Sequence, residues 1–146
     1  MTVRLRGHHL LCLLTYASKG YSPAFVANAD AVADRVFDGE AIRIVEGADD
    51  ICAPLLGTTG HHCDGRTAER RDRLALADIG VYLGRRLAVG AVLQPDADER
   101  RALAQAFAAG RVRAACANCV WQRHCGLVAR RAFAGTRWNG REKPRP

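Results

Sequence analysis

The ten residues CANCVWQRHC, from Cys116 to Cys125, place three thiols in the spacing C-x2-C-x5-C. Residues three apart share a helix face, but at about 100° per residue Cys125 would point away from Cys116 on a straight helix. One helix therefore cannot aim all three sulfurs at one point. We expect a knuckle-like turn at Cys116 and Cys119. The following helix would then carry Cys125 in its first turns, where its N-terminal dipole favours a negatively charged metal–thiolate centre.

The chain has 146 residues, a length typical of one compact domain. A domain of this size buries roughly two-thirds of its unfolded surface, so it can build a hydrophobic core without covalent staples. Its six cysteines therefore call for a chemical reason. We expect a single cysteine-rich helical domain over residues 1–138, followed by a mobile polar tail over residues 139–146.

The sequence carries no sign of a membrane segment or a secretion signal. Its N-terminal apolar run, LLCLL, is short and soon gives way to polar residues, and no small-residue cleavage site follows. No segment approaches the roughly 18 uninterrupted apolar residues of a membrane span. These features predict a cytoplasmic protein. In a reducing compartment, clustered cysteines are metal ligands or redox thiols more often than disulfides.

Hydrophobic periodicity predicts a mainly α (α+β) fold: one compact helical domain with a short β element and a cysteine-ligated metal or cluster site. Ser22 before Pro23 is typical of a helix N-cap, and Asp96 with Glu99 is typical of a capping box. The alternating run AIRIVEG predicts a strand over residues 41–47. Helices are expected over about residues 7–19, 22–38, 66–84, 95–110 and 121–133, with Leu74, Ala77 and Val81 on the apolar face of the third.

A tetrahedral thiolate site needs a fourth ligand beside the three thiols of the knuckle. Residues 47–65 resist a regular assignment, and a loop with proline and glycine joins Cys52 to Cys63 within them. Such a loop can bend back to present both sulfurs. His61 and His62 are further donor candidates, although adjacent histidines on a glycine loop are as often solvated. The predicted cofactor ligands are Cys63, Cys116, Cys119 and Cys125, with Cys52 as the alternative ligand.

On a helix, His8, His9 and Cys12 share one stripe with Tyr16 and Lys19, while leucines cover the other sides. A helix that is apolar nearly all round is buried, so this stripe forms a polar seam inside the protein. On one interpretation Cys12 is simply a small buried hydrophobe. The seam also predicts that His8, His9 and Cys12 surround the metal centre, where hydrogen bonds to cluster sulfur or to a ligand tune such sites.

Spacing leaves the metal open between zinc and iron–sulfur. Four thiolates suit zinc, and so do three thiolates with one imidazole. Zinc modules often pair two C-x2-C knuckles, and this chain has one. Cysteines dispersed over several elements in apolar surroundings are more typical of an iron–sulfur cluster.

A family likeness rests on stretches spread over most of the chain: RLRGHHLLCLLTY, GYSPAFVANAD, DDICAP, HHCDGRTAERRDRLAL and RAACANCVWQRHCG. With them the chain resembles the bacterial and archaeal domain-of-unknown-function family number 1284, whose members are regarded as iron–sulfur binding proteins. The resemblance runs from about Val3 to Trp138. It places the family's cysteines on all six cysteines here, and its His-His pair on His8 and His9. It implies an iron–sulfur cofactor and brings neither a reaction nor a substrate.

The leading hypothesis is a small cytoplasmic iron–sulfur protein with one 4Fe-4S cluster, acting with a redox or protein partner in electron transfer, cluster handling or redox sensing. The alternative is a zinc-stabilised module that contacts nucleic acid or protein through arginines. The formal charge of +7 is carried almost entirely by arginine, and a basic balance can serve acidic partners. Nucleic acid is not favoured, because no single basic stripe stands out and aromatic residues are not interleaved with the arginines. The arginines considered for that role are Arg66, Arg70, Arg73, Arg111 and Arg113.

The sequence offers no recognised catalytic motif, since it has no phosphate loop, dinucleotide fingerprint or serine elbow. An enzyme would need another arrangement. His8 and His9 with Asp49 and Asp50 could act beside a cluster, or Cys63 could pair with a neighbouring histidine. The sequence therefore favours binding or electron transfer over catalysis.

Overall fold

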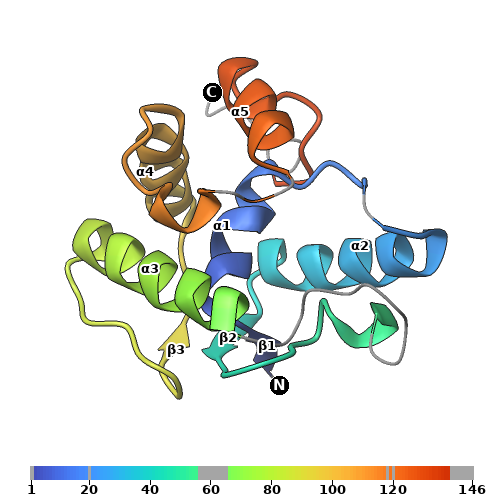
Figure 1. Ribbon diagram of the computed structural model, residues 1–146, viewed down its shortest axis with the longest axis horizontal. Helices are drawn as coiled ribbons and strands as arrows, with labels where there is room; N and C mark the ends of the chain where they lie inside the picture. Colours follow the sequence, from blue (N-terminus) through green and yellow to red (C-terminus); the bar gives the residue numbers. More distant parts are fainter. Residues whose placement is uncertain (1, 20, 56–65, 118, 120, 139–146) are drawn as a thin grey trace.

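The computed structural model describes residues 2–19, 21–55, 66–117, 119 and 121–138. Its elements confirm the expected mainly α, α+β architecture, with helices gathered around a small sheet (Figure 1). The predicted tail, residues 139–146, lies outside the described residues. In chain order the elements are β1 (Thr2–Leu5), α1 (Gly7–Thr15), α2 (Pro23–Phe37), β2 (Ala41–Ile44), the 3-10 helix η1 (Ala53–Leu55), α3 (Arg66–Leu83), β3 (Val92–Leu93), α4 (Ala97–Ala108), the 3-10 helix η2 (Ala114–Cys116) and α5 (Gln122–Arg130).

The sheet has the order β1-β2-β3, with β1 parallel to β2 and β3 antiparallel to β2. The strand predicted over residues 41–47 is confirmed in its first half by β2. Val3 of β1 pairs with Ile42 of β2, and both side chains are buried. Sequence patterning does not predict β1 or β3. β1 is four residues long, with Arg4 on the exposed side of its alternation, and β3 is two residues long, so both depend on pairing with β2.

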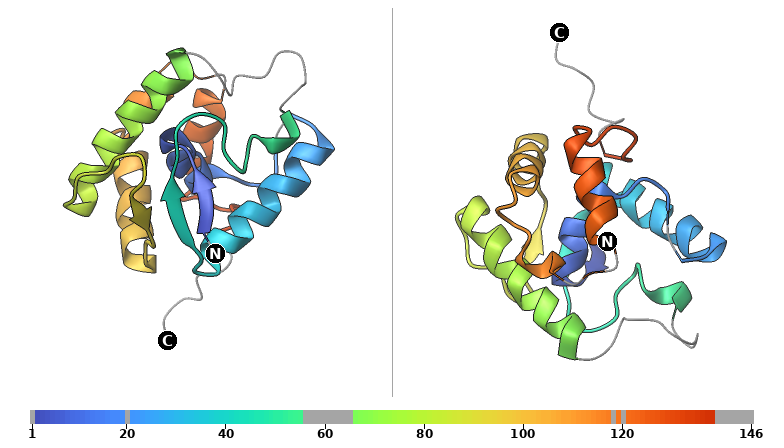
Figure 2. Two further views of the ribbon diagram at one scale, coloured as in Figure 1. Left: turned by 90° about the horizontal axis from the view of Figure 1, so that it is seen from below. Right: turned by 45° about the horizontal axis from the view of Figure 1, so that its top comes forward.

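Helix α1 runs through the middle of the molecule, with α2 on one side and α3 and α4 on the other (Figures 1 and 2). Gly7 lets α3 come close, because a Cβ at this position would lie 2.5 Å from the carbonyl oxygen of Asp72. The approach brings the start of α1 against the polar side chain of Asp72 and not only against apolar residues. Within the described part of the chain, no helix is both long and apolar enough to cross a bilayer.

The buried face of α3 differs in part from the predicted one. Leu74 packs against the core as predicted, whereas Ala77 is exposed and Val81 is 78% exposed. Ala68, Ala75 and Ile79 complete the buried face. Both stripes repeat at helical spacing, so periodicity alone does not choose between them. The small side chains at residues 68 and 75 fit the close packing of α3 on α1, and this packing decides which face is buried.

Helix α1 ends at Thr15, earlier than predicted, because Tyr16 adopts an extended conformation. The helical stripe is therefore wrong for Tyr16 and Lys19, although both line the cavity described below. Trp138, the last described residue, contacts the C-terminal end of α1. Its Nε1 donates a hydrogen bond of 2.6 Å to the Leu14 carbonyl. A buried indole N–H and an otherwise unpaired helix carbonyl thus satisfy each other.

The predicted caps are confirmed. Ser22 Oγ accepts a hydrogen bond of 3.1 Å from the Phe25 N–H, and Asp96 with Glu99 forms a reciprocal capping box. The last helix is shorter than expected. It ends before Phe133, because Ala132 and Phe133 have φ angles of 54° and 59°, outside the helical range.

Candidate metal centre

A cavity of about 440 Å³ opens beside α1 and is lined by thiols from distant parts of the chain. Cys12 comes from α1, Cys116 ends η2, Cys119 lies in the following turn, and Cys125 comes from α5. We call these four the cavity thiols. Cys52 lines the same cavity from the turn between β2 and η1. None of these five cysteines forms a disulfide.

Between Cys116 and Cys125, the residues that the structure describes form the predicted turn and helix start. The Cys119 N–H donates a hydrogen bond of 3.0 Å to the Cys116 carbonyl, which closes the turn. Helix α5 then begins at Gln122 and carries Cys125 in its first turn, where the Cys125 N–H donates to the Trp121 carbonyl at 2.8 Å. The turn lets one short segment direct three thiols to one cavity, which a straight helix could not do.

Helix α1 supplies the fourth cavity thiol, Cys12. One turn further along, Thr15 Oγ1 donates a hydrogen bond of 3.1 Å to the Cys125 sulfur, which links α1 to α5. The Cys12 side chain is exposed to the cavity, yet the protein crowds it closely, and this crowding raises the pKa of the thiol well above its usual range. The charges of Cys125, Cys119 and Cys116 raise that pKa further. The four cavity thiols are therefore electrostatic neighbours.

Burial also raises the pKa of Cys116 and the pKa of Cys125. Positive groups oppose this effect. Arg113 hydrogen-bonds Cys116, and its charge and that of Arg71 favour the thiolate form of Cys116. Without a metal, the raised pKa values keep the Cys12, Cys116 and Cys125 thiols protonated at neutral pH. A metal would bind the thiolates and release protons, with nearby arginines offsetting the negative charge.

In the described part of the chain, the cavity thiols are not gathered at the sulfur spacing of a tetrahedral zinc site. Zinc–sulfur bonds of about 2.3 Å require sulfur atoms about 3.8 Å apart. Among the described residues, every set of three cavity thiols includes a pair of sulfur atoms more than 4.8 Å apart. An all-thiol donor set around a roomy cavity fits a polynuclear iron–sulfur group, which is held by cysteine thiolates at a wider spacing. Such a group would supply one-electron chemistry at this place.

The remaining predicted ligands are placed differently. Cys63, His61 and His62 lie outside the described residues, so their ligand roles stay predictions. Cys52 is only 1% exposed and lies against Asp49, whose carboxylate accepts the Cys52 N–H at 3.2 Å. Cys52, the predicted alternative ligand, therefore belongs to a separate group of side chains on the cavity wall.

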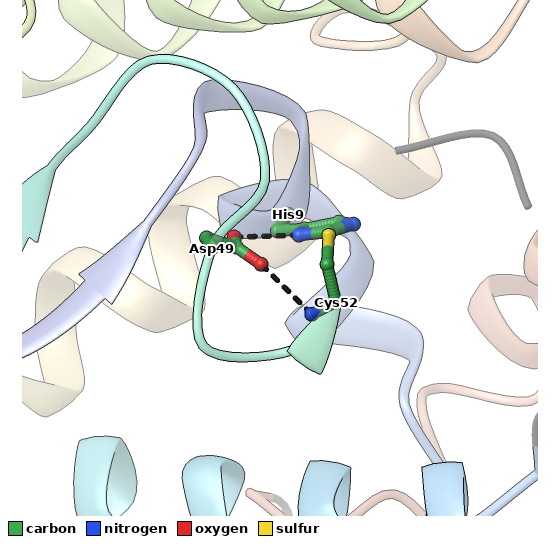
Figure 3. Close-up of side chains that lie close together, drawn as sticks. All are labelled: His9, Asp49 and Cys52. Atoms are coloured by element: carbon green, nitrogen blue, oxygen red, sulfur yellow. Dashed lines mark hydrogen bonds and ion pairs between the residues drawn. The ribbon is translucent and has the colours of Figure 1, made fainter. Parts of the chain in front are cut away.

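His8 and His9 line the cavity, each anchored to a carboxylate. His8 Nδ1 lies 2.6 Å from Asp72 Oδ1, and His9 Nδ1 lies 2.7 Å from Asp49 Oδ2 (Figure 3). Burial alone would raise the pKa of Asp49, but the charge and hydrogen bond of His9 and the backbone N–H of Arg6 lower it to about 2. Because the carboxylate is ionised, the imidazole Nδ1 carries the proton. The outer nitrogen, Nε2, is then available as an acceptor or a ligand.

The sequence did not predict the roles of three residues at this centre. Thr15 and Arg113 hydrogen-bond cavity thiols, and Asp72 anchors His8. Thr15 carries a local signal, because it lies one turn after Cys12 in a helix otherwise filled with leucine. Asp72 has no such signal, since it reaches α1 from a helix more than sixty positions later. Its role depends on tertiary packing that no local pattern encodes.

The buried His8 predicts acid sensitivity. Burial lowers the pKa of His8 to about 4, outweighing the Asp72 carboxylate, which favours the charged form. In the unfolded chain the pKa is about 6.5. The stabilisation from neutral His8 is therefore complete above about pH 6.5 and is lost as the pH falls towards 4. We expect the free energy of unfolding to fall by about 3 kcal/mol over this range from His8 alone.

Urea unfolding at several pH values between 7 and 4 checks this slope. His8→Gln should flatten it, because glutamine does not titrate. The matched variant His124→Gln should keep it, since His124 packs on the Trp121 ring. Equal slopes in wild type and His8→Gln would show that other groups cause the acid sensitivity.

A family profile described as "Protein of unknown function (DUF1284)" matches residues 20–125, which is most of the chain. The chain belongs to this family. The matched segment contains Cys52, Cys63 and the three knuckle cysteines, whereas Cys12 precedes it. Neither the curated proteins nor the solved structures contain a match. The family description assigns no activity, so the function has to be argued from the site.

Proposed function

We propose that the chain is a small iron–sulfur protein that holds one cluster, a 4Fe-4S cluster by preference, on the four cavity thiols. The single observation that carries this proposal is the convergence of Cys12 with Cys116, Cys119 and Cys125 on one cavity of about 440 Å³. Four cysteine thiolates are the usual ligand set of such clusters. This assignment gives Cys12 the ligand role that was predicted for Cys63.

The electrostatic surroundings support the proposal. A thiolate cluster carries negative charge, and Arg113 lies beside two of its ligands in a fixed position. The Arg113 guanidinium centre lies 4.4 Å from the centre of the Phe107 ring, and one of its amino groups donates 3.0 Å to the Gln122 carbonyl. Thr15 adds a hydrogen bond to the Cys125 sulfur. A protein sets the reduction potential of a cluster partly through nearby charges and hydrogen bonds to the sulfur atoms.

Electron transfer, cluster handling or redox sensing would follow from such a cluster, with a redox or protein partner. The start of α5, which follows the knuckle, lies near the surface, because Gln122 and Arg123 are exposed. We place the protein in the cytoplasm as part of this proposal. The five cysteines that the structure describes form no disulfide, which suits a reducing compartment.

The zinc-stabilised module that binds nucleic acid has less support. The spread of the cavity thiols is unfavourable for zinc. Arg113 is engaged with Cys116 and the Phe107 ring, so it does not serve a phosphate backbone. Arg66, Arg70 and Arg73 are exposed on α3, but Asp and Glu side chains are interspersed with them in the helix.

Anaerobic purification followed by metal analysis tests the proposal. We expect a coloured protein that contains iron and acid-labile sulfide in equal amounts, and we expect added zinc not to displace the iron. The absorption and the sulfide content distinguish a cluster from iron bound as single ions. A colourless protein with one zinc per chain would reject the proposal in favour of the structural module.

A further inference from the structure

A second group of side chains on the cavity wall has chemistry of its own. His9, Asp49 and Cys52 bring an imidazole nitrogen, a carboxylate oxygen and a sulfur within 4.8 Å of one another (Figure 3). Asp49 and Cys52 belong to the turn after β2, and His9 belongs to α1. Asn28 of α2 holds this turn in place, since its side-chain amide donates 2.7 Å to the Asp50 carbonyl.

Hydrogen bonding decides what Asp49 does in this group. One carboxylate oxygen accepts the N–H groups of Ile51 and Cys52, at 3.0 and 3.2 Å. The other accepts the Arg6 N–H at 2.8 Å and His9 Nδ1 at 2.7 Å. A carboxylate offers about four lone-pair sites, these four hydrogen bonds use them, and the Cys52 side chain hydrogen-bonds the same carboxylate as well. Asp49 would have to give up a hydrogen bond to bind a metal, so it acts as the group that orients His9.

His9 and Cys52 are then left as a base and a thiol. Because Nδ1 donates to Asp49, the His9 lone pair is on Nε2. The Cys52 sulfur lies within 4.8 Å of an imidazole nitrogen of His9, and Figure 3 shows the sulfur beside the ring. The buried guanidinium of Arg6 is also within hydrogen-bonding reach of this sulfur. An oriented base and a fixed cation are the features that activate a thiol as a nucleophile.

We propose that Cys52 is a nucleophilic thiol that accepts a sulfur atom from a small persulfide, with His9 as its base. His9 Nε2 takes the Cys52 proton, and the thiolate attacks the outer sulfur of R–S–SH. A bond forms between the two sulfurs, and the bond to the R–S sulfur breaks. The departing R–S⁻ takes the proton back from His9. The products are Cys52–S–SH and R–SH, with no net oxidation or reduction.

Two observations favour sulfur over a carbonyl carbon as the electrophile. Attack on a carbonyl develops an oxyanion, which backbone N–H groups usually stabilise. The N–H groups of Ile51 and Cys52 both donate to Asp49. Cys52 is also only 1% exposed and is reached from the cavity, so the transferred group has to be compact. A single sulfur atom meets this limit. The proposal goes beyond cluster binding, because it needs no electron from the cluster.

The test uses the anaerobically purified full chain and cysteine persulfide as the probe. Peptide mass analysis should find one added sulfur on Cys52, and Cys52→Ala should abolish that product. His9→Gln should slow the addition about 100-fold, the low end of a general-base contribution. Glutamine can still donate to Asp49, so the turn is kept. His124→Gln should keep the wild-type rate. Denaturant should erase the difference between His9→Gln and wild type.

Iron content separates this inference from the proposed cluster. His9→Gln should keep its iron while it loses persulfide reactivity. Equal rates in His9→Gln and wild type, or no sulfur on Cys52 in the folded protein, would overturn the inference. So would a zinc ion that the wild type binds and His9→Gln does not, since His9 and Cys52 would then be metal ligands. If Cys52→Ala does not fold, the comparison of His9→Gln with wild type decides alone.

Discussion

Cys12→Ser is expected to yield a protein that has lost nearly all of its iron and sulfide, at least a tenfold decrease. Cys12 is the one cavity thiol that α1 contributes, and its charge couples to the other three. Serine is a poor ligand for the soft iron–sulfur centre. Because the side chain is exposed to the cavity, the change leaves the hydrophobic core intact. Iron and sulfide per chain, measured after anaerobic reconstitution, give the answer.

Two further variants make the ligand assignment specific. Cys52→Ala should keep the cluster, because Cys52 is occupied by the group around Asp49. Cys63→Ser separates the sequence-based prediction from the structural assignment. Full iron in Cys12→Ser combined with loss of iron in Cys63→Ser would show that residues 56–65 supply the fourth ligand and that Cys12 only surrounds the site.

Asp72→Ala is expected to lower the free energy of unfolding by about 3–5 kcal/mol, the range for breaking a buried ion pair. The Asp72 carboxylate accepts from Arg6 Nε at 3.0 Å, from the His8 N–H at 3.1 Å and from His8 Nδ1 at 2.6 Å. Arg6 is 1% exposed, so its charge would stay buried without the carboxylate. Thermal and urea unfolding of the purified protein measure the loss.

Asp98→Ala is the matched control for Asp72→Ala. Asp98 pairs with Arg101 on the surface of α4 and is 73% exposed, so its loss should cost less than about 1 kcal/mol. The same small effect in both variants would mean that Arg6 finds another partner or water when Asp72 is removed. It would contradict the view that Asp72 fixes α1, and with it His8, against α3.

The turn at Cys116 and Cys119 was predictable because it follows from the spacing of cysteines that are close together in the sequence. The angle between successive residues on a helix excludes a straight helix through three converging thiols, and the chain makes the turn that this requires at Cys116 and Cys119. The caps at Ser22 and Asp96 were predictable for the same reason, since each depends on residues within one turn. The alternating apolar pattern of the strand at Ala41–Ile44 likewise predicted the α+β fold class.

Features that depend on distant partners were not predictable. The buried face of α3 follows from its close packing on α1 at Gly7, and its sequence offers two equivalent stripes. The early end of α1 at Tyr16 leaves the Leu14 carbonyl to Trp138, which satisfies it from the far end of the described chain. Cys12 lines the same cavity as the knuckle thiols, and this meeting depends on α5 packing against α1 through Thr15 and Cys125. No spacing in the sequence relates these two segments.

Anomalous X-ray scattering from anaerobically grown crystals tests the central claim most directly. Data collected on both sides of the iron absorption edge locate iron without reference to colour or chemical analysis. The account predicts one compact multi-iron peak in the cavity, with the sulfur atoms of Cys12, Cys116, Cys119 and Cys125 as its ligands. A single zinc peak, or an iron peak bound by Cys52 or Cys63 with Cys12 turned away, would contradict it.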